Sequence, residues 1–305
     1  MQKLKNLSLP MAQNVLKNKP ARTPLDLNTP ESCTWCPGCG DFAIWAALKQ
    51  AAIRFGWDNT NTALVAGIGC HGHLVNFLAL TSFEGLHGRA IPVASGLKMA
   101  NHDLNVFVIT GDGDCLAEGG NHFVQASRRN QNITVILYDN AIYALTTGQT
   151  SPRSPRGFKS KSSPFGNIEE PVHPLRLALA SGATFLARAY AGDIPHLIQM
   201  IKEANAHQGF AVLQVLQPCV TFNHVYTHQF YQENTYKLGP EYDPTDQSAA
   251  WKKTLEWGLK QIPVGVLYQV HQPTYEAQVP QIQTETLVKQ GVQKRDIRAT
   301  LKKFQ

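Results

Sequence analysis

Four short apolar runs rich in β-branched residues alternate with stretches of helical periodicity, and this alternation limits the possible folds more than any other feature. The runs are Thr62–Ala66, Leu104–Thr110, Ile133–Tyr138 and Phe210–Leu216. The helical stretches before and between them include Asp41–Phe55, Leu116–Arg129, His173–Ala180 and Ile194–Ala206. Strands that are continuously apolar and separated by helices are typical of a parallel sheet covered on both sides. The sequence therefore predicts an α/β fold, with a mostly parallel sheet and helices on both faces.

The composition narrows the class of protein. The 305 residues are 43% hydrophobic and 16% charged, enough to bury a sizeable core. No apolar run approaches the roughly 18 residues of a membrane span, so we expect a soluble protein that does not enter membranes. The net charge is +6, but the basic residues are scattered, which argues against a nucleic-acid partner. Six cysteines in a large, core-rich chain indicate metal or redox chemistry in a reducing compartment, so we expect the cytoplasm.

Changes in composition divide the chain into three predicted segments. Residues 1–30 are polar, contain four prolines and are expected to form an extended N-terminal arm. Residues 31–235 carry the alternating pattern and form the main domain. Residues 236–305 lose this pattern and are expected to form a C-terminal extension over the surface. Within the main domain, residues 146–171 are rich in Ser, Pro, Gly and Lys, and a loop of this length is usually functional or mobile.

Chemically reactive residues follow each of the four predicted strands. The strands run in turn into Gly67-Ile68-Gly69-Cys70, Gly111-Asp112-Gly113-Asp114, Asp139-Asn140 and Pro218-Cys219. The carboxyl ends of parallel strands meet at one edge of the sheet, where ligands bind. We therefore expect these residues to lie around one site.

The Gly-Asp-Gly-Asp turn predicts a site for a phosphate group and a hard cation. Its glycines let the backbone approach a phosphate, and the following helix begins with free N–H groups. Asp112 offers a carboxylate, and Asn140, 28 positions further on, offers an amide oxygen. A Mg²⁺ ion with a diphosphate satisfies both features. The alternative is a turn without a functional role, which the position of Asn140 disfavours.

Six ordered motifs over about residues 31–235 resemble the β subunit of 2-oxoacid:ferredoxin oxidoreductases, and within that family the 2-oxoglutarate type. The motifs are W-C-P-G-C-G-D (35–41), G-I-G-C (67–70), G-L-H-G-R-A (85–90), G-D-G-D (111–114), D-N-x-x-Y (139–143) and P-C-V-T-F-N (218–223). The resemblance implies a thiamine diphosphate-binding fold. It also implies coenzyme A-dependent oxidative decarboxylation of a 2-oxoacid, with electrons passed through a four-iron four-sulfur cluster to ferredoxin.

The resemblance also implies roles for individual residues around the cofactor. Asp112 and Asn140 would ligate Mg²⁺, with the carbonyl of Ile142 as a third ligand. The residues implied in thiamine diphosphate binding are Ile68, Gly69, Cys70, His87, Gly111, Gly113, Asp114, Asn140 and Ile142. His87 would reach the diphosphate or the substrate and is a candidate catalytic residue; the alternative is a loop histidine. Arg89 is a second candidate, which would pair with a substrate carboxylate or with a neighbouring subunit.

Four cysteines match those that hold the cluster in this family: Cys36, Cys39, Cys70 and Cys219. A C-x-x-C turn and two strand ends can close a cage of four thiolates. Zinc also accepts four thiolates, but a structural zinc does not explain the neighbouring thiamine diphosphate motif. Cys33 is a possible competing ligand, and we expect Cys115 in the core.

The sequence departs from the family pattern at two places. His71 and His73 follow Cys70 where some members carry small residues and then Lys or Arg, so either histidine could replace the usual basic residue at the substrate carboxylate. Arg153 and Ser154 stand where Thr is common.

Partner subunits are implied as well. Thiamine is activated by a carboxylic acid at its pyrimidine ring, and neither Glu84 nor Glu118 suits that position. The family places this glutamate on an α subunit, so we expect an α/β heterodimer, doubled by two-fold symmetry. The remaining alternatives are a pyruvate or broad-range 2-oxoacid enzyme, a non-oxidative or indolepyruvate-type relative, and a zinc-stapled nucleic-acid-binding module. The four cysteines disfavour the non-oxidative enzyme, and the module leaves the Gly-Asp-Gly-Asp turn without a function.

Overall fold

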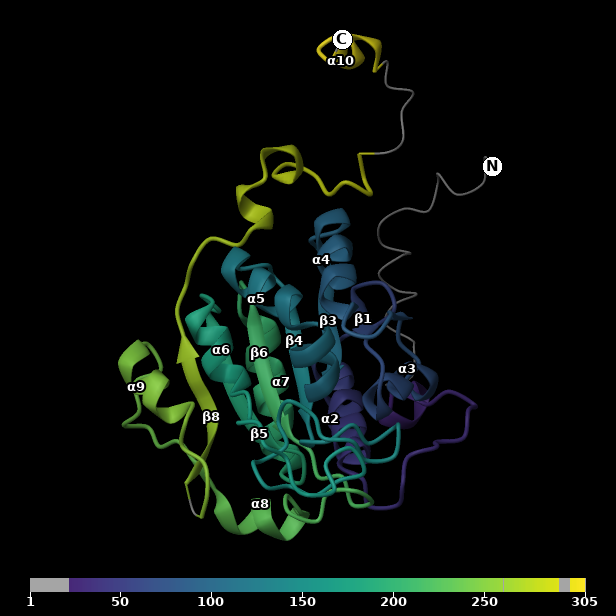
Figure 1. The fold of residues 1–305 in the computed structure, drawn as a ribbon. Helices are drawn as coiled ribbons and strands as arrows, with labels where there is room; N and C mark the ends of the chain where they lie inside the picture. The colour runs from purple at the N-terminus through teal and green to yellow at the C-terminus, as the bar shows by residue number, and fades with distance from the viewer. Residues whose placement is uncertain (1–21, 260, 291–296, 305) are drawn as a thin grey trace.

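A computed structural model describes residues 22–259, 261–290 and 297–304 (Figure 1). One sheet in this part of the chain has eight strands in the order β2-β1-β3-β4-β6-β5-β8-β7. The four predicted runs are strands β1 (Thr62–Ala66), β3 (Asn105–Gly111), β4 (Thr134–Asp139) and β6 (Ala211–Leu216). They pair in parallel as neighbours, which confirms the predicted sheet.

Four further strands complete the sheet: β2 (Ser82–Glu84), β5 (Phe185–Tyr190), β7 (Thr235–Lys237) and β8 (Ile262–Gln269). β2 and β5 extend the parallel part beside β1 and β6. β8 pairs antiparallel with β5, and β7 pairs parallel with β8.

Helices cover both faces of the sheet, as predicted. Alternate strand residues point to opposite sides, so Leu64 and Ile109 pack in one core and Val65 and Val108 in the other. The first core is covered by α2 (Gly40–Phe55), α3 (Leu74–Phe77) and α7 (Ile194–Ala206). The second is covered by α4 (Ala90–Ala100), α5 (Gly120–Arg129) and α6 (Pro174–Ala180). The remaining helices are α8 (His228–Asn234), α9 (Gln247–Lys253) and α10 (Arg298–Leu301).

Five short helical turns complete the elements: η1 (Pro24–Leu27), η2 (Cys70–His73), η3 (Asp114–Glu118), η4 (Glu276–Gln278) and η5 (Pro280–Ile282). η3 is a π-helix, where the sequence predicted a regular helix from Leu116. The N–H of Gly119 bonds to the carbonyl of Asp114, five residues back, so α5 begins only at Gly120. Such wide turns are frequent at functional sites.

The C-terminal part differs from the expectation of a surface extension after residue 235. β8 lies inside the sheet next to β5, and Ile262 and Leu267 are fully buried. This strand was not predicted from the sequence, because Pro263 and Gly265 interrupt its apolar pattern. The predicted boundary at residue 235 therefore falls within the sheet.

The N-terminal arm was predicted over residues 1–30, of which residues 1–21 lie outside the described part. The end of the arm is not extended: η1 places Leu27 fully buried in the core, and Asn28 bridges to Leu78. In the described part of the chain, no helix combines the length and apolar character that crossing a bilayer requires.

Candidate functional site

The carboxyl ends of β1, β3 and β4 open onto one cavity of about 80 Å³, the strand-end cavity. Every residue that the sequence assigned to the cofactor or to Mg²⁺ at these ends lines it: Ile68, Gly69, Cys70, His87, Gly111, Asp112, Gly113, Asp114, Asn140 and Ile142. The long loop between β4 and α6 lies across the same end of the sheet (Figure 1). The predicted convergence of strand ends is therefore present, while the ligands themselves stay a prediction.

Asp112 provides a buried carboxyl in this cavity. It is 2% exposed, and its Oδ2 accepts a hydrogen bond from the Ser151 hydroxyl. Burial and the nearby Asp139 raise the pKa of Asp112 to about 8. Asn140, whose Oδ1 accepts the Ile142 N–H at 3.0 Å, lines the same cavity. A carboxylate, an amide and a backbone carbonyl form an all-oxygen donor set, which fits Mg²⁺.

Asp114 organises the loops around the cavity. Its Oδ1 accepts the N–H groups of Ile68 at 3.2 Å and Gly88 at 2.7 Å, and Thr110 donates to its Oδ2 at 2.5 Å. Burial raises the pKa of this carboxyl, but the nearby His71 ring and the hydrogen bonds from Thr110 and Gly88 outweigh it and leave the pKa well below its usual range. Asp114 therefore ties the ends of β1 and β3 to the G-L-H-G-R loop.

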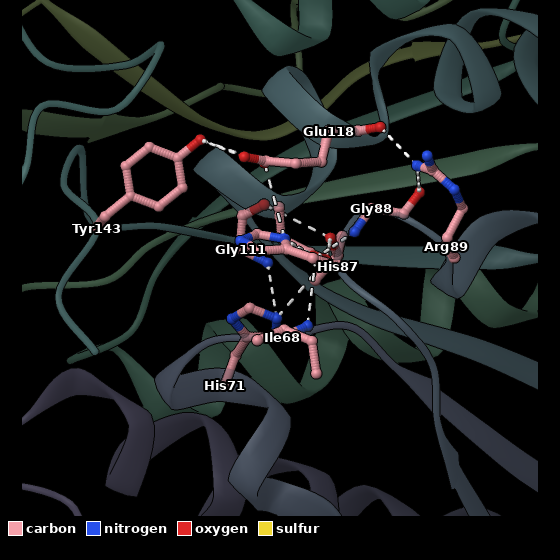
Figure 2. A network of polar contacts seen from close by, with 10 residues as sticks. Ile68, His71, His87, Gly88, Arg89, Gly111, Glu118 and Tyr143 are labelled. Carbon is pink, nitrogen blue, oxygen red and sulfur yellow. Dashed lines mark hydrogen bonds and ion pairs between the residues drawn. The ribbon is translucent and has the colours of Figure 1, made fainter. Parts of the chain in front are cut away.

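His87 faces the cavity with one ring nitrogen already engaged. Its Nδ1 lies 2.7 Å from Asp114 Oδ1, and Glu118 Oε2 lies 3.7 Å from the same nitrogen (Figure 2). The ring meets Tyr143 edge-on, with the ring centroids 6.2 Å apart. Tyr143 is held in turn by the Glu118 carboxylate at 3.2 Å. Because Nδ1 is bound to a carboxylate, Nε2 is the nitrogen available to a ligand.

Arg89 is not among the residues that line the strand-end cavity. Its guanidinium donates to the carbonyl oxygens of Glu118 at 2.7 Å and Gly88 at 3.3 Å (Figure 2). Arg89 thus links the G-L-H-G-R loop to the π-helix, and its contact with a substrate stays a prediction.

His71, singled out as a departure from the family pattern, is buried at the wall of the strand-end cavity. Its Nε2 accepts the backbone N–H of Gly111 at 3.1 Å and lies 3.8 Å from Asp114 Oδ2 (Figure 2). The ring fills the space beside Gly69 and Gly111, where a Cβ would come within 3 Å of it. His73 lies elsewhere, with Nδ1 3.1 Å from the Thr34 hydroxyl.

A second cavity, of about 180 Å³, is lined by the four predicted cluster cysteines, Cys36, Cys39, Cys70 and Cys219, and is called the cysteine cavity here. Among the described residues, no three His, Cys, Asp or Glu side chains are grouped to hold one metal ion. The four cysteines share one cavity, and the group that they would hold stays a prediction.

Burial dominates the acid–base state of Cys70 and Cys219. It raises the pKa of Cys70 to about 12, helped by Asp41 and by the neighbouring thiols of Cys219 and Cys36. It also raises the pKa of Cys219, although backbone N–H groups of residues 221–223 oppose the shift. A bound metal centre would stabilise the thiolate forms of these two side chains.

The other two cysteines do not line the cysteine cavity. Cys33 packs against the core beside α2, and Cys115 is 1% exposed in the core on the other face, which confirms its predicted place.

The two cavities meet at Cys70. Both Cys70 and Asn140 line the strand-end cavity and the cysteine cavity. Cys70 follows Ile68 and Gly69, so one short piece of main chain borders both.

Sequence reasoning missed several residues that shape the site. Ser151 and Arg153 from the long loop are buried against Asp112 and Asp139. Asp41 lines the cysteine cavity at 1% exposure, where the sequence indicated only a helix-start residue. For Arg153, one sequence signal pointed to a special role: an arginine stands where Thr is common in the family.

Comparison with known proteins gives independent evidence about the family of this chain. Residues 67–215 match the family described as thiamine pyrophosphate enzyme, C-terminal TPP binding domain. Residues 219–284 match the family described as the C-terminal part of the pyruvate ferredoxin oxidoreductase beta subunit.

Individual relatives extend over most of the chain. A 2-oxoacid:ferredoxin oxidoreductase subunit beta from Sulfolobus sp is 45% identical over 82% of this chain and 87% of its own length. A 2-oxoglutarate oxidoreductase subunit KorB from Mycobacterium tuberculosis is 40% identical over 72% of this chain and 57% of its own length. The solved 2-oxoglutarate:ferredoxin oxidoreductase from Magnetococcus marinus, with 2-oxoglutarate, coenzyme A and succinyl-CoA bound, is 35% identical. It superposes with a TM-score of 0.85 and covers 94% of this chain and 98% of that chain.

Proposed function

Because this chain belongs to the β subunits of 2-oxoacid:ferredoxin oxidoreductases, we propose that it serves the coenzyme A-dependent oxidative decarboxylation of 2-oxoglutarate. In this proposal it uses thiamine diphosphate, Mg²⁺ and a four-iron four-sulfur cluster, and ferredoxin accepts the electrons. The observation that carries the proposal is that Cys70 borders both the strand-end cavity and the cysteine cavity. A cofactor site next to a redox site is what an oxidative decarboxylase needs.

The bound groups would supply the chemistry that side chains lack: an electron sink for loss of carbon dioxide, and a one-electron acceptor. The residues of this chain bind and orient them. Asp112, Asn140 and the Ile142 carbonyl would hold Mg²⁺ against the diphosphate. His87, fixed at Nδ1 by Asp114, would present Nε2 to the diphosphate or substrate. Cys36, Cys39, Cys70 and Cys219 would hold the cluster.

The choice of 2-oxoglutarate rests on similar proteins and on the histidines near the site. The KorB proteins and the Magnetococcus marinus enzyme are named for 2-oxoglutarate. His73 lines the cysteine cavity, and His87 lines the strand-end cavity. A protonated histidine in either place would attract the distal carboxylate of this substrate.

The proposal includes an α partner that supplies the activating glutamate. Among the described residues that line the strand-end cavity, Asp112 and Asp114 are the only acids, and neighbouring side chains engage both. Glu118 is bonded to Tyr143 beside the diphosphate end. We therefore expect an αβ unit, doubled by two-fold symmetry, that acts in the cytoplasm.

The test is anaerobic co-expression with an α subunit. We expect broad visible absorption bleached by dithionite, and a higher kcat/KM for 2-oxoglutarate than for pyruvate with coenzyme A and ferredoxin. A colourless zinc protein would refute the cluster, and a preference for pyruvate would refute the substrate.

Asp112→Ala should abolish Mg²⁺-dependent thiamine diphosphate binding and leave the visible spectrum intact. The β chain alone should not turn over; activity equal to that of the complex would show that the α partner is dispensable.

A further inference from the structure

We propose that Arg153 is a positioning residue for the metal site: it pairs with Asp139 and thereby fixes the Asp139-Asn140 turn that presents Asn140 to a divalent cation. This inference rests on the proposed function, because it takes Asp112 and Asn140 as Mg²⁺ ligands.

The pair of Arg153 and Asp139 is fully enclosed. Arg153 Nε donates to Asp139 Oδ2 at 2.8 Å, and the two side chains are 3% and 1% exposed. Gln214 Nε2 donates to the same oxygen at 2.5 Å. Asp139 Oδ1 is buried and has no hydrogen-bond partner among the residues that the structure describes. Without Arg153, the Asp139 carboxylate would keep a single neutral donor, and a buried charge with so little support does not hold its position.

The turn that carries Arg153 also clamps the residues on both sides of Asn140. Ser151 donates its hydroxyl to Asp112, and its own Oγ accepts the Arg153 N–H at 3.2 Å. Ser154 donates its hydroxyl to the carbonyl of Ala141, the residue after Asn140, at 2.7 Å. Ala141 has a φ of 57°, a conformation that needs such support outside glycine. Three side chains of one short turn thus hold Asp112, Asp139 and Ala141.

Two buried acidic side chains, Asp112 and Asp139, lie near two buried guanidinium groups, Arg153 and Arg188, and all four are at most 3% exposed. Arg188 is linked to Asp139 by Gln214. The Nε of Arg188 donates to Gln214 Oε1 at 2.8 Å, and Gln214 Nε2 donates to Asp139.

The C-terminal part holds Arg153 from the other side. The Trp257 ring lies under the Arg153 guanidinium, 4.8 Å from the ring centroid to Cζ, and Arg153 also donates to the carbonyl of Val172 at 2.8 Å. Its position is therefore set by contacts independent of any cofactor.

The test measures metal affinity on the αβ complex stripped with a chelator, by calorimetric titration of Mg²⁺ at one fixed concentration of thiamine diphosphate for all variants. We expect Arg153→Met to weaken Mg²⁺ binding about 10- to 100-fold, the usual effect of losing a residue that orients a metal ligand. Arg156→Met is the matched control, because Arg156 lies on the same loop in an exposed pair with Glu170. It should bind Mg²⁺ as the unchanged protein does.

A second variant separates pairing from folding. Asp139→Asn combined with Arg153→Met removes both charges and should recover most of the lost affinity. Unchanged or tighter Mg²⁺ binding in Arg153→Met, or no recovery in the double variant, would overturn the inference. If Arg153→Met gives no assembled complex, the double variant decides: assembly with near-normal Mg²⁺ binding supports the inference, and failure to assemble refutes it.

The Asp112→Ala variant is measured in the same way and separates the inference from the proposed function. If Asp112→Ala still binds Mg²⁺ normally, the proposed function itself fails. If Asp112→Ala loses Mg²⁺ binding while Arg153→Met binds Mg²⁺ normally, the inference alone fails.

Discussion

The indole Nε1 of Trp35 donates a hydrogen bond to the carbonyl oxygen of Cys70 at 2.7 Å. This bond joins the C-x-x-C segment to the end of β1 across 35 positions of sequence. Trp35 is further held edge-on by Phe42 and Phe77, with centroid distances of 5.5 and 5.1 Å. The two pieces of chain that carry Cys36, Cys39 and Cys70 are therefore fixed relative to each other before any cluster is considered.

Trp35→Phe should loosen the cysteine cavity. The substitution keeps most of the apolar contact but leaves the Cys70 carbonyl without its donor, at a cost of about 1–3 kcal/mol. We expect faster loss of iron to a chelator and a lower thermal midpoint. Trp45→Phe is the control, because the Trp45 Nε1 is buried and has no hydrogen-bond partner in the described part of the chain. Equal iron release from both variants would contradict the role given to the Trp35 bond.

The cluster ligands can be assigned by iron counting on single serine variants. Cys219→Ser should lose most of its iron, because Cys219 lines the cysteine cavity. Cys33→Ser should keep a full complement, since Cys33 packs against the core outside that cavity. Full iron in Cys219→Ser together with loss in Cys33→Ser would reverse the assignment.

Asp114→Asn should disorder the loops of the strand-end cavity. The amide brings two hydrogens to a place where the N–H groups of Ile68 and Gly88 already point at the Asp114 side chain. We expect a loss of roughly 2–4 kcal/mol of stability, the range for a disrupted buried polar network. Denaturant unfolding of the apoprotein measures it. Glu118→Gln, which alters a half-exposed carboxylate next to the same loop, should change stability far less.

His207 should make stability depend on pH. Burial, with a smaller contribution from His271, lowers the pKa of His207 to about 4. The unfolded chain takes up a proton near the ordinary value of 6.5 while the folded chain does not, so stability falls as the pH drops from about 6.5 to 4. The slope for one proton is about 1.4 kcal/mol per pH unit.

His207→Gln tests this dependence because glutamine can still bond to the Thr184 hydroxyl, which lies 2.7 Å from His207 Nε2. The slope between pH 6.5 and 4 should fall by about 1.4 kcal/mol per pH unit in this variant when unfolding is followed in denaturant. His224→Gln, at an exposed histidine, should keep it. The same slope in both variants would show that another group is responsible.

The parallel half of the sheet was predictable because its strands are apolar without interruption. β5 was not, because Arg188 breaks its apolar run; only the structure shows that Gln214 and two backbone carbonyls satisfy this buried guanidinium. β8 was missed for a similar reason, since Pro263 and Gly265 are unusual within a strand.

The candidate site followed from sequence as far as its members were tied to strand ends. The strand-end members of the two cavities, such as Cys70, Asp112 and Asn140, were expected near one another because parallel strands bring their carboxyl ends together. The role of Asp114 as an anchor for several N–H groups could not be read from spacing, because it depends on which way the carboxylate turns. For Arg89 the motif suggested more than the structure shows. The motif predicted contact with a substrate carboxylate, whereas the guanidinium donates hydrogen bonds to two backbone carbonyls.

The shared position of Cys70 sets a limit on distance. Ile68, Gly69 and Cys70 line the strand-end cavity, and Cys70 also lines the cysteine cavity. Three consecutive residues reach at most about 10 Å, and this upper bound holds in every backbone conformation because it follows from bond lengths and planar peptide units. Groups bound beside these residues in the two cavities would therefore stay close to each other, whatever the loops elsewhere do.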